Sequence, residues 1–314
     1  MKDGNWTLVT EFILFGLSED PELQLPLFVL FFLIYIITVL CNLSVIILIW
    51  ISLNLHTPMY ILLSNLSFVD ICCSSAITPK MLGTFLLKKT ISLPGCVAQF
   101  FVFAYMVGAE IFLLTALSYD RYVAICNPLR YTTIMTKQAC TFIVVFISLI
   151  SLLDPLIHTI CILRLSFCSS NEIMHFHCDV IPLLKLSCSE TSLNELLVTY
   201  EGSFLTIASV VPIIISYICI ISTIMRIKSS NGRWRTFSTC SSHAASVTLY
   251  FGTIAVMYIS PNTINSLEQG RVAAVFYTVV IPMANPMIYS LRNKDVKDSL
   301  RKAMQKIPLR GKTL

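Results

Sequence analysis

The chain has 314 residues, of which 56% are hydrophobic and only 12% are charged, and its mean hydropathy is +0.78. Charged residues make up about a quarter of a soluble domain, so this composition excludes that class and indicates a membrane protein. The net charge of +5 is explained by basic residues that gather beside the membrane, and it does not require a nucleic-acid partner.

The first 24 residues form an acidic arm. They carry one lysine and five acidic residues, and they lack the basic start and apolar centre of a cleavable signal peptide. Asn5-Trp6-Thr7 is an acceptor sequence for N-glycosylation. We therefore expect residues 1–24 to be an extracellular arm that is glycosylated at Asn5.

Seven long apolar segments follow, and each is close to the length of about 20 residues that crosses a bilayer as a helix. They lie near residues 25–49, 59–79, 97–119, 140–162, 197–225, 239–259 and 272–291. The sequence therefore predicts an all-α fold, a seven-transmembrane helix bundle over residues 25–291, with a second outer loop at about 163–196.

The positions of lysine and arginine predict the orientation in the membrane. The segments after the third, fifth and seventh spans hold 3, 4 and 8 of these residues, which is 15 of the 22 in the chain. The positive-inside rule places those segments in the cytoplasm. The C-terminus is then cytoplasmic and the N-terminus extracellular.

The cytoplasmic tail, residues 292–314, contains a helical pattern of its own. Val296, Leu300 and Met304 recur at helical spacing, opposite a basic face that is made by Lys294, Lys297, Arg301 and Lys302. Such a pattern predicts a short amphipathic helix that lies on the inner leaflet.

Two acidic residues are expected at one depth inside the membrane. Asp70 lies 12 residues after Pro58, where the second span begins, or about 18 Å along a helix. Glu110 precedes Asp120, at the cytoplasmic end of the third span, by 10 residues, or about 15 Å. Two such carboxyl groups can share a proton or bind a cation, and the residues alone leave both interpretations open.

Four of the twelve cysteines are expected on the outer, oxidising side of the membrane: Cys96, Cys168, Cys178 and Cys188. Four cysteines allow three pairings, and their spacing does not choose among them. His175, His177 and Cys178 could alternatively form a metal site, although a disulfide at Cys178 would remove its best ligand.

Four strings of residues resemble those of a known family. An Asp-Arg pair alone would be read as a salt-bridged helix end, but here it lies within the longest string. The strings are LHTPMY (55–60), LLTALSYDRYVAICNP (113–128), RTFSTCSSH (235–243) and PMANPMIYSLRNK (282–294). In this order and topology the chain resembles the odorant receptors, a branch of the rhodopsin-like G-protein-coupled receptors, over nearly its whole length.

The resemblance implies a plasma-membrane receptor with two partners besides the lipid bilayer. One is a small volatile odorant, and the other is a heterotrimeric stimulatory G protein of the olfactory type, which raises cyclic AMP. It also implies the disulfides Cys96–Cys178 and Cys168–Cys188, and a sodium ion at Asp70 and Glu110 with no other cofactor.

The resemblance further implies a switch near the cytoplasm, in which Arg121 is latched to Asp120 at rest. The residues that it assigns to G-protein coupling are Asp120, Arg121, Tyr122, Tyr217, Asn285, Pro286 and Tyr289.

A depth argument places the odorant in the outer half of the bundle, above Glu110. Phe103, Val107 and Ile111 recur four apart on the third span, and Ala104 and Gly108 adjoin their face. The sixth and seventh spans are expected to contribute Phe251, Ala255, Tyr258 and Thr278, the last one heptad outward from Asn285. The resemblance implies that the fifth span contributes Glu201, Gly202 and Leu205, positions that commonly border the pocket in this family. A chamber that is mostly apolar, with few polar groups, is typical of a small-molecule site.

Some members of this set have competing interpretations. Ordinary helix packing explains any single apolar member, and Glu201 could face water at the mouth of the chamber instead of the ligand. At Tyr250-Phe251 the family more often has Phe before Tyr, so the identity of the inward aromatic residue is open.

Two other classes of protein compete with the receptor. A transporter or channel would use the intramembrane acids as an ion path, but such proteins commonly show internal repeats, which this chain lacks. An enzyme would need a nucleophile or metal pattern that Asp154, His158, His243 and Ser246 do not supply, so we interpret these four as packing residues and expect no enzymatic activity.

Overall fold

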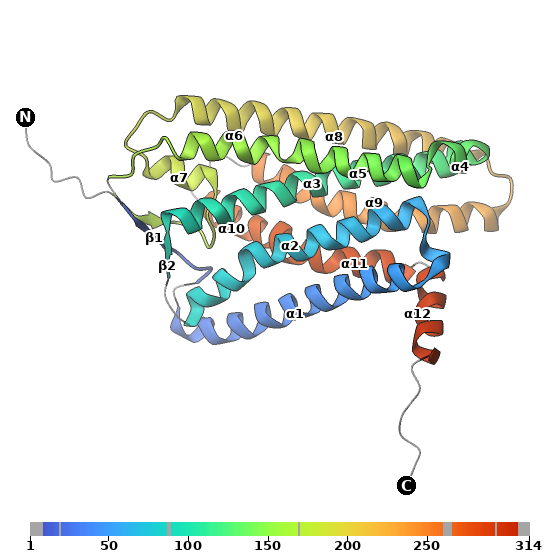
Figure 1. The fold of residues 1–314 in the computed structure, drawn as a ribbon, viewed down its shortest axis with the longest axis horizontal. Helices are drawn as coiled ribbons and strands as arrows, with labels where there is room; N and C mark the ends of the chain where they lie inside the picture. Colours follow the sequence, from blue (N-terminus) through green and yellow to red (C-terminus); the bar gives the residue numbers. More distant parts are fainter. Residues whose placement is uncertain are drawn as a thin grey trace, which may run out of the picture.

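Long helices that run along one common axis make up most of the molecule (Figure 1). The structure is a computed structural model, and it describes residues 9–18, 20–86, 89–168, 170–259, 266–292 and 294–306. The spanning helices are α1 (Pro21–Ile51), α2 (Pro58–Leu86), α3 (Leu93–Cys126), α5 with α6 (Lys137–Ser151 and Leu153–Ile162), α8 (Ser192–Arg226), α9 (Ser230–Ile259), and α10 (Ser266–Val275) with the π-helix η3 (Phe276–Val280) and α11 (Ile281–Arg292). These match the seven predicted spans, and the prediction of a seven-helix bundle is confirmed.

The short elements lie at the two ends of this bundle. They are the strands β1 (Glu11–Leu14), β2 (Thr90–Ser92) and β3 (Glu172–Ile173), the 3₁₀ turns η1 (Leu53–Leu55) and η2 (Pro128–Arg130), and the helices α4 (Tyr131–Ile134), α7 (Val180–Leu186) and α12 (Lys294–Lys306). The strands gather at one end and α12 lies at the other (Figure 1).

Among the described residues, six helical segments have both the length and the apolar composition of a membrane span. Helix α9 is not among them, although it has 30 residues, and serine, threonine and arginine are frequent in its first half. It nevertheless packs against α3, α8, α10 and α11 as part of the same bundle. These contacts make α9 one of the helices of the bundle.

Helix α3 lies at the centre of the bundle and contacts α2, α5, α6, α8 and α9. Leu114 and Leu117 of α3 and Leu66 and Ile77 of α2 are buried members of the main hydrophobic core. Helix α1 is different, because many of its apolar side chains are exposed, as Leu33 and Leu40 show. An apolar surface of this kind suits contact with lipid.

The fourth span is broken into α5 and α6 at Leu152. Pro155 explains the break, because it has no N–H group to donate to the carbonyl of Ser151 and its ring clashes with that carbonyl. The break places Asp154 in the first turn of α6.

A small sheet covers the outer end of the bundle, and the sequence analysis did not predict it. Strand β1 pairs antiparallel with β2 and parallel with β3, so the N-terminal arm joins the second outer loop to the start of α3. Phe12 and Leu14 of β1 are fully buried in a second hydrophobic cluster. The four outer cysteines form disulfides Cys96–Cys178 and Cys168–Cys188, the pairing that the resemblance implied.

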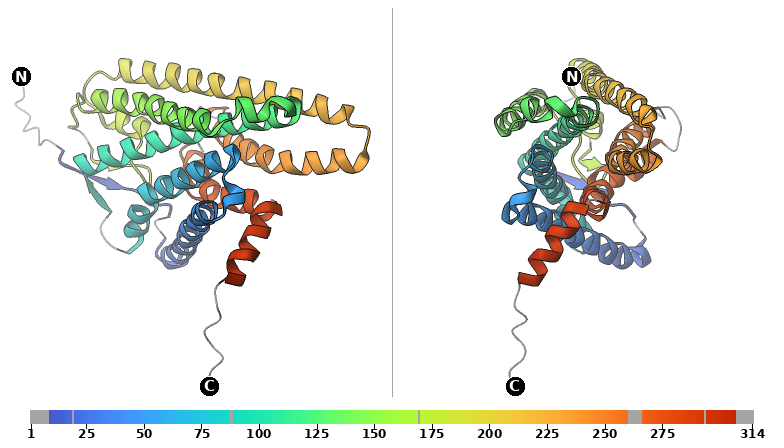
Figure 2. Two further views of the ribbon diagram at one scale, coloured as in Figure 1. Left: turned by 45° about the vertical axis from the view of Figure 1, so that its right-hand side comes forward. Right: turned by 90° about the vertical axis from the view of Figure 1, so that its right-hand side faces the viewer.

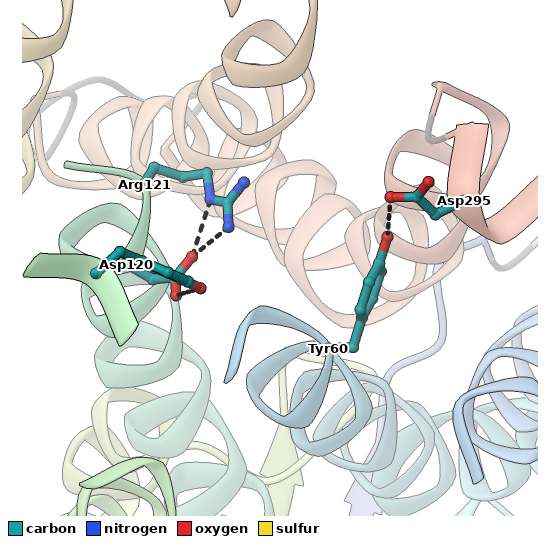
Figure 3. Close-up of polar contacts among 5 residues, drawn as sticks. Tyr60, Asp120, Arg121 and Asp295 are labelled. Atoms are coloured by element: carbon teal, nitrogen blue, oxygen red, sulfur yellow. Dashed lines mark hydrogen bonds and ion pairs between the residues drawn. The ribbon is translucent and has the colours of Figure 1, made fainter. Parts of the chain in front are cut away.

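Helix α12 lies across the direction of the other helices, as the view along the bundle in Figure 2 shows. Val296 is buried, whereas Leu300 is exposed, and the side chain of Met304 lies outside the described residues. The Tyr60 hydroxyl donates a hydrogen bond of 3.5 Å to Asp295 Oδ2, which ties α12 to the start of α2 (Figure 3). The predicted amphipathic helix after the seventh span is therefore present.

Candidate functional site

A cavity of about 570 Å³ lies in the outer half of the bundle. Seven of the twelve residues that we predicted for the ligand chamber line it: Phe103, Ala104, Val107, Gly108, Ile111, Gly202 and Leu205. Phe103 also contacts the rings of His177 in the outer loop and Tyr277 in η3, with centroids 5.3 Å and 5.8 Å away. The prediction therefore identified the walls that α3 and α8 provide.

The walls that α9 and the seventh span provide differ from the prediction. There, the residues that line the cavity are those directly before the predicted ones in the sequence. Phe251 packs edge to face against Tyr250 and does not line the cavity, whereas Tyr250 and Ile254 do. Ala255 is exposed on the outside of the bundle. One residue turns an α-helix by about 100°, so an error of one position moves a side chain from the cavity to another face.

In the seventh span, Tyr277 of η3 lines the cavity in place of Thr278. Thr278 is fully buried, and its hydroxyl donates a hydrogen bond of 2.7 Å to the Ala274 carbonyl in its own helix. The π-helix explains the difference, because its wider turn contains an additional residue and changes the phase of everything outward of it. The residue that faces the cavity, Tyr277, is therefore eight positions outward from Asn285, whereas the prediction counted seven and chose Thr278.

Three further predictions have separate outcomes. Glu201 does not line the cavity, but its Oε2 lies 3.0 Å from Nε2 of His158, which does. The side chain of Tyr258 and the whole of Asn5 lie outside the described residues. Sequence reasoning missed Asp154 and His158 as cavity residues, and their i, i+4 spacing was the available signal.

The outer loop carries two buried histidines, His175 and His177, and His175 lines the cavity. Burial, and after it the positive charge of Arg271, lowers the pKa of His175 to about 4. Burial also holds the pKa of His177 well below its usual value, and the neighbouring His175 adds to this effect. Both imidazoles are therefore neutral at physiological pH, and Cys178 lies in a disulfide, so the alternative metal site in this loop has lost one ligand.

The predicted pair of acids meets Asn285 in the middle of the bundle. Asp70 and Glu110 are buried, and Asn285 Nδ2 donates to Asp70 Oδ1 at 3.2 Å and to Glu110 Oε1 at 3.3 Å. Glu110 Oε2 and Asn285 Oδ1 are buried oxygens without a hydrogen-bond partner among the described residues. Oxygen atoms of this kind are the ligands that hard cations bind, so the residues fit a cation such as sodium.

The predicted latch lies near the cytoplasmic end of α3. Arg121 Nε donates to Asp120 Oδ2 at 3.0 Å, and its Nη2 forms an ion pair with the same oxygen (Figure 3). The Tyr131 hydroxyl donates to Asp120 Oδ1 at 2.8 Å, a contact that the sequence analysis missed. Asp120 is fully buried, so these two partners satisfy both of its oxygens.

The remaining switch residues lie between the acid pair and the cytoplasmic end of the bundle. Tyr217 Oη on α8 lies 2.5 Å from His243 Nδ1 on α9, and the His243 ring lies 6.4 Å from that of Tyr289. Tyr122 packs against Tyr217 in a small cluster that joins α3 to α8 and α9. Pro286 lies inside α11, directly after Asn285. The predicted switch residues thus come from three spans, and His243 of α9 joins two of them, Tyr217 and Tyr289.

Comparison with known proteins identifies the family. Residues 31–306 match the olfactory receptor family. The chain belongs to the olfactory receptors. It is 50% identical to olfactory receptor 8G1 of Homo sapiens, over 98% of this chain and 99% of that one. It is 52% identical to olfactory receptor-like protein COR4 of Gallus gallus, over 97% and 98% of the two chains.

A solved structure supports the fold independently. Squid rhodopsin superimposes with a TM-score of 0.71 and 14% sequence identity, over 92% of this chain and 87% of that one. The resemblance stated from the sequence is therefore confirmed. As an olfactory receptor the chain is a multi-pass membrane protein and a receptor for small molecules that couples to G proteins, and it is not an enzyme.

Proposed function

We propose that this olfactory receptor binds a small volatile odorant in the cavity between α3, α6, α8 and α9, and raises cyclic AMP through a stimulatory G protein of the olfactory type. The observation that carries the proposal is the position of the cavity. It lies outward of Glu110, is lined mainly by apolar side chains such as Phe103, Val107 and Leu205, and is covered by the outer loop. A volume of about 570 Å³ is in the range of small-molecule sites.

Helix α9 offers a physical route from the cavity to the switch. Tyr250 lines the cavity and His243 contacts Tyr217, seven residues or about 10 Å inward on the same helix. A ligand that binds better when α9 has moved shifts the population toward the form with the open latch. Signalling then requires only this difference in affinity between the two forms.

The experiment is a screen of volatile compounds on cells that express the receptor with a cyclic-AMP reporter. Arg121→Ala should abolish the response to every agonist while surface expression persists, because Arg121 is the residue released toward the G protein. Normal signalling by Arg121→Ala would contradict the coupling proposal. A response that requires a G protein of another class would contradict the stimulatory assignment.

The orientation is part of the same proposal. The cytoplasmic assignment of the segments after α3, α8 and α11 rests on their 15 basic residues, and it makes the sheet end of the bundle extracellular. Antibody access to tags at the two termini in intact cells tests it, and staining of a C-terminal tag without permeabilisation would contradict it.

Sodium is proposed as a ligand of the resting form. Asp70 and Glu110 would hold the ion, which would supply positive charge to two buried carboxyl groups that Asn285 alone does not neutralise. Asp70→Asn should then weaken the dependence of basal signalling on sodium at fixed pH. A response that follows pH and ignores sodium would favour the alternative, a proton shared by the two acids.

A further inference from the structure

Three side chains from two helices converge beside the cavity. Asp154 and His158 are one turn apart on α6, which begins at Leu153, and they face Glu201 of α8. His158 Nε2 lies 3.5 Å from Asp154 Oδ1 and 3.0 Å from Glu201 Oε2. One ligand atom from each residue lies within 4.8 Å of the others.

This cluster is short of positive charge. Carboxylates within a membrane span are costly unless they are paired. In the part of the chain that the structure describes, the ion-pair partner of both Asp154 and Glu201 is the same His158, which carries at most one charge. Asp179 and Lys185 also line the cavity, but neither forms an ion pair with the cluster among the described contacts, and Lys185 is exposed.

We propose that Asp154, His158 and Glu201 form a binding site for a divalent transition-metal ion of the zinc class. Imidazole nitrogen and carboxylate oxygen bind zinc at about 2.0–2.2 Å, and tetrahedral bonds of that length separate neighbouring ligand atoms by about 3.3 Å. The two measured separations of 3.0 Å and 3.5 Å lie on either side of this value.

The orientation of the side chains is a second, independent observation. His158 is 95% buried, with a relative exposure of 5%, and its Nε2 points at both carboxylates. Glu201 Oε2 is also buried, yet it makes no hydrogen bond of ordinary geometry in spite of its distance from His158. His158 Nε2 and Glu201 Oε2 therefore lie 3.0 Å apart in a buried position, a separation that two ligands of one ion also have.

The site leaves room for a fourth ligand. Three protein ligands with one open position are typical of zinc sites that bind an exchangeable molecule. Asp154 and His158 line the cavity, so the open position faces the same space that we propose for the odorant. The metal site does not depend on that proposal, but an effect of the ion on odorant potency does.

The test uses the full-length receptor, purified in detergent through a tag without histidine. Co²⁺ serves as the spectroscopic probe for Zn²⁺, which has no visible absorption. We expect one Co²⁺ per receptor, with the intense visible bands of a four-coordinate ion, and displacement of the Co²⁺ by Zn²⁺. His158→Ala and Glu201→Gln should each weaken the affinity at least tenfold.

Two controls make the result decisive. His175→Ala removes a histidine that also lines the cavity but lies outside the cluster, and it should leave Co²⁺ binding unchanged. Glu201→Gln keeps the size of the side chain, and its thermal unfolding, compared with that of the unmodified receptor, separates loss of the ligand from loss of the fold. Asp154→Asn is the second conservative variant should Glu201→Gln fail to fold.

Either of two results would overturn the metal site: no Co²⁺ uptake by the unmodified receptor, or uptake that survives His158→Ala and is lost in His175→Ala. Because no odorant or G protein is present, the outcome is independent of the proposed function. A receptor that binds Co²⁺ but answers no volatile compound would contradict the proposed function and leave the metal site intact.

Discussion

The hydrogen bond from Tyr131 to Asp120 predicts that Tyr131→Phe raises signalling in the absence of ligand. The substitution removes one hydroxyl and leaves Asp120 Oδ1 without its partner inside a fully buried carboxylate. A hydrogen bond to a charged group contributes about 1.5–3 kcal/mol. This corresponds to a shift of roughly 10- to 150-fold in the equilibrium between the closed and open latch.

The contact that is lost is made in the closed form, in which Asp120 also pairs with Arg121. We expect Tyr131 to separate from Asp120 when the latch opens, so Tyr131→Phe should destabilise the closed form, which makes this hydrogen bond, more than the open form. The rise in basal cyclic AMP is smaller than the shift in the equilibrium if the open form is already appreciably populated.

The assay is basal cyclic AMP per receptor at the cell surface. The matched control is Tyr119→Phe, since Tyr119 lies at the same end of α3 but is exposed, and its described contact is the ring of Tyr122. Unchanged or reduced basal signalling in Tyr131→Phe, at normal surface expression, would refute the closed-latch interpretation. An equal rise in basal cyclic AMP in both variants would indicate that the loss of any tyrosine hydroxyl near the membrane boundary causes the effect, and not the loss of the hydrogen bond to Asp120.

Three other outcomes follow from the structure. Val107→Phe fills the cavity and should lower agonist potency at least tenfold, whereas Ala255→Phe, on the outside of α9, should leave the potency unchanged. Asn42→Ala removes a buried hydrogen bond of 2.9 Å to the Pro282 carbonyl and should cost about 1–3 kcal/mol in thermal unfolding, while Asn65→Ala, whose amide bonds within its own helix, should cost less. Protonation of the buried His175 should destabilise the outer loop as the pH falls. The loss of stability begins near the pKa of about 6.5 in the unfolded chain and is complete near the pKa of about 4 in the folded protein. His175→Phe should weaken this dependence in hydrogen exchange of the loop, and an unaltered pH profile would count against it.

The number and order of the spans could be predicted because lipid imposes a simple condition on the sequence. Every residue that faces the bilayer must be apolar over about 20 positions, so the spans appear as uninterrupted apolar runs. The ends could not be predicted in the same way. Helix α3 begins at Leu93 and ends at Cys126, beyond the predicted 97–119, and its first turn is stabilised by a local contact, the Ser92 side chain that accepts a hydrogen bond from the Gly95 N–H.

The walls of the cavity show when helical periodicity predicts the direction of a side chain and when it does not. On α3 the prediction used an unbroken helix, and all five residues were correctly placed. In the seventh span the π-helix η3 at Phe276–Val280 lies between the reference residue Asn285 and the cavity. No residue type in that segment predicts a π-helix. An unbroken helix is the condition under which residue spacing can be converted into a facing direction.

The cluster of Asp154, His158 and Glu201 required information of another kind. The spacing of Asp154 and His158 was visible, but two residues on one helix are more often packing residues than ligands. Glu201 was assigned to the pocket for a different reason, its place in the family. What unites the three is the contact between α6 and α8, together with the break at Pro155 that sets the phase of α6. Neither the contact nor the phase can be derived from the residues of a single span, because each depends on how two helices pack against α3.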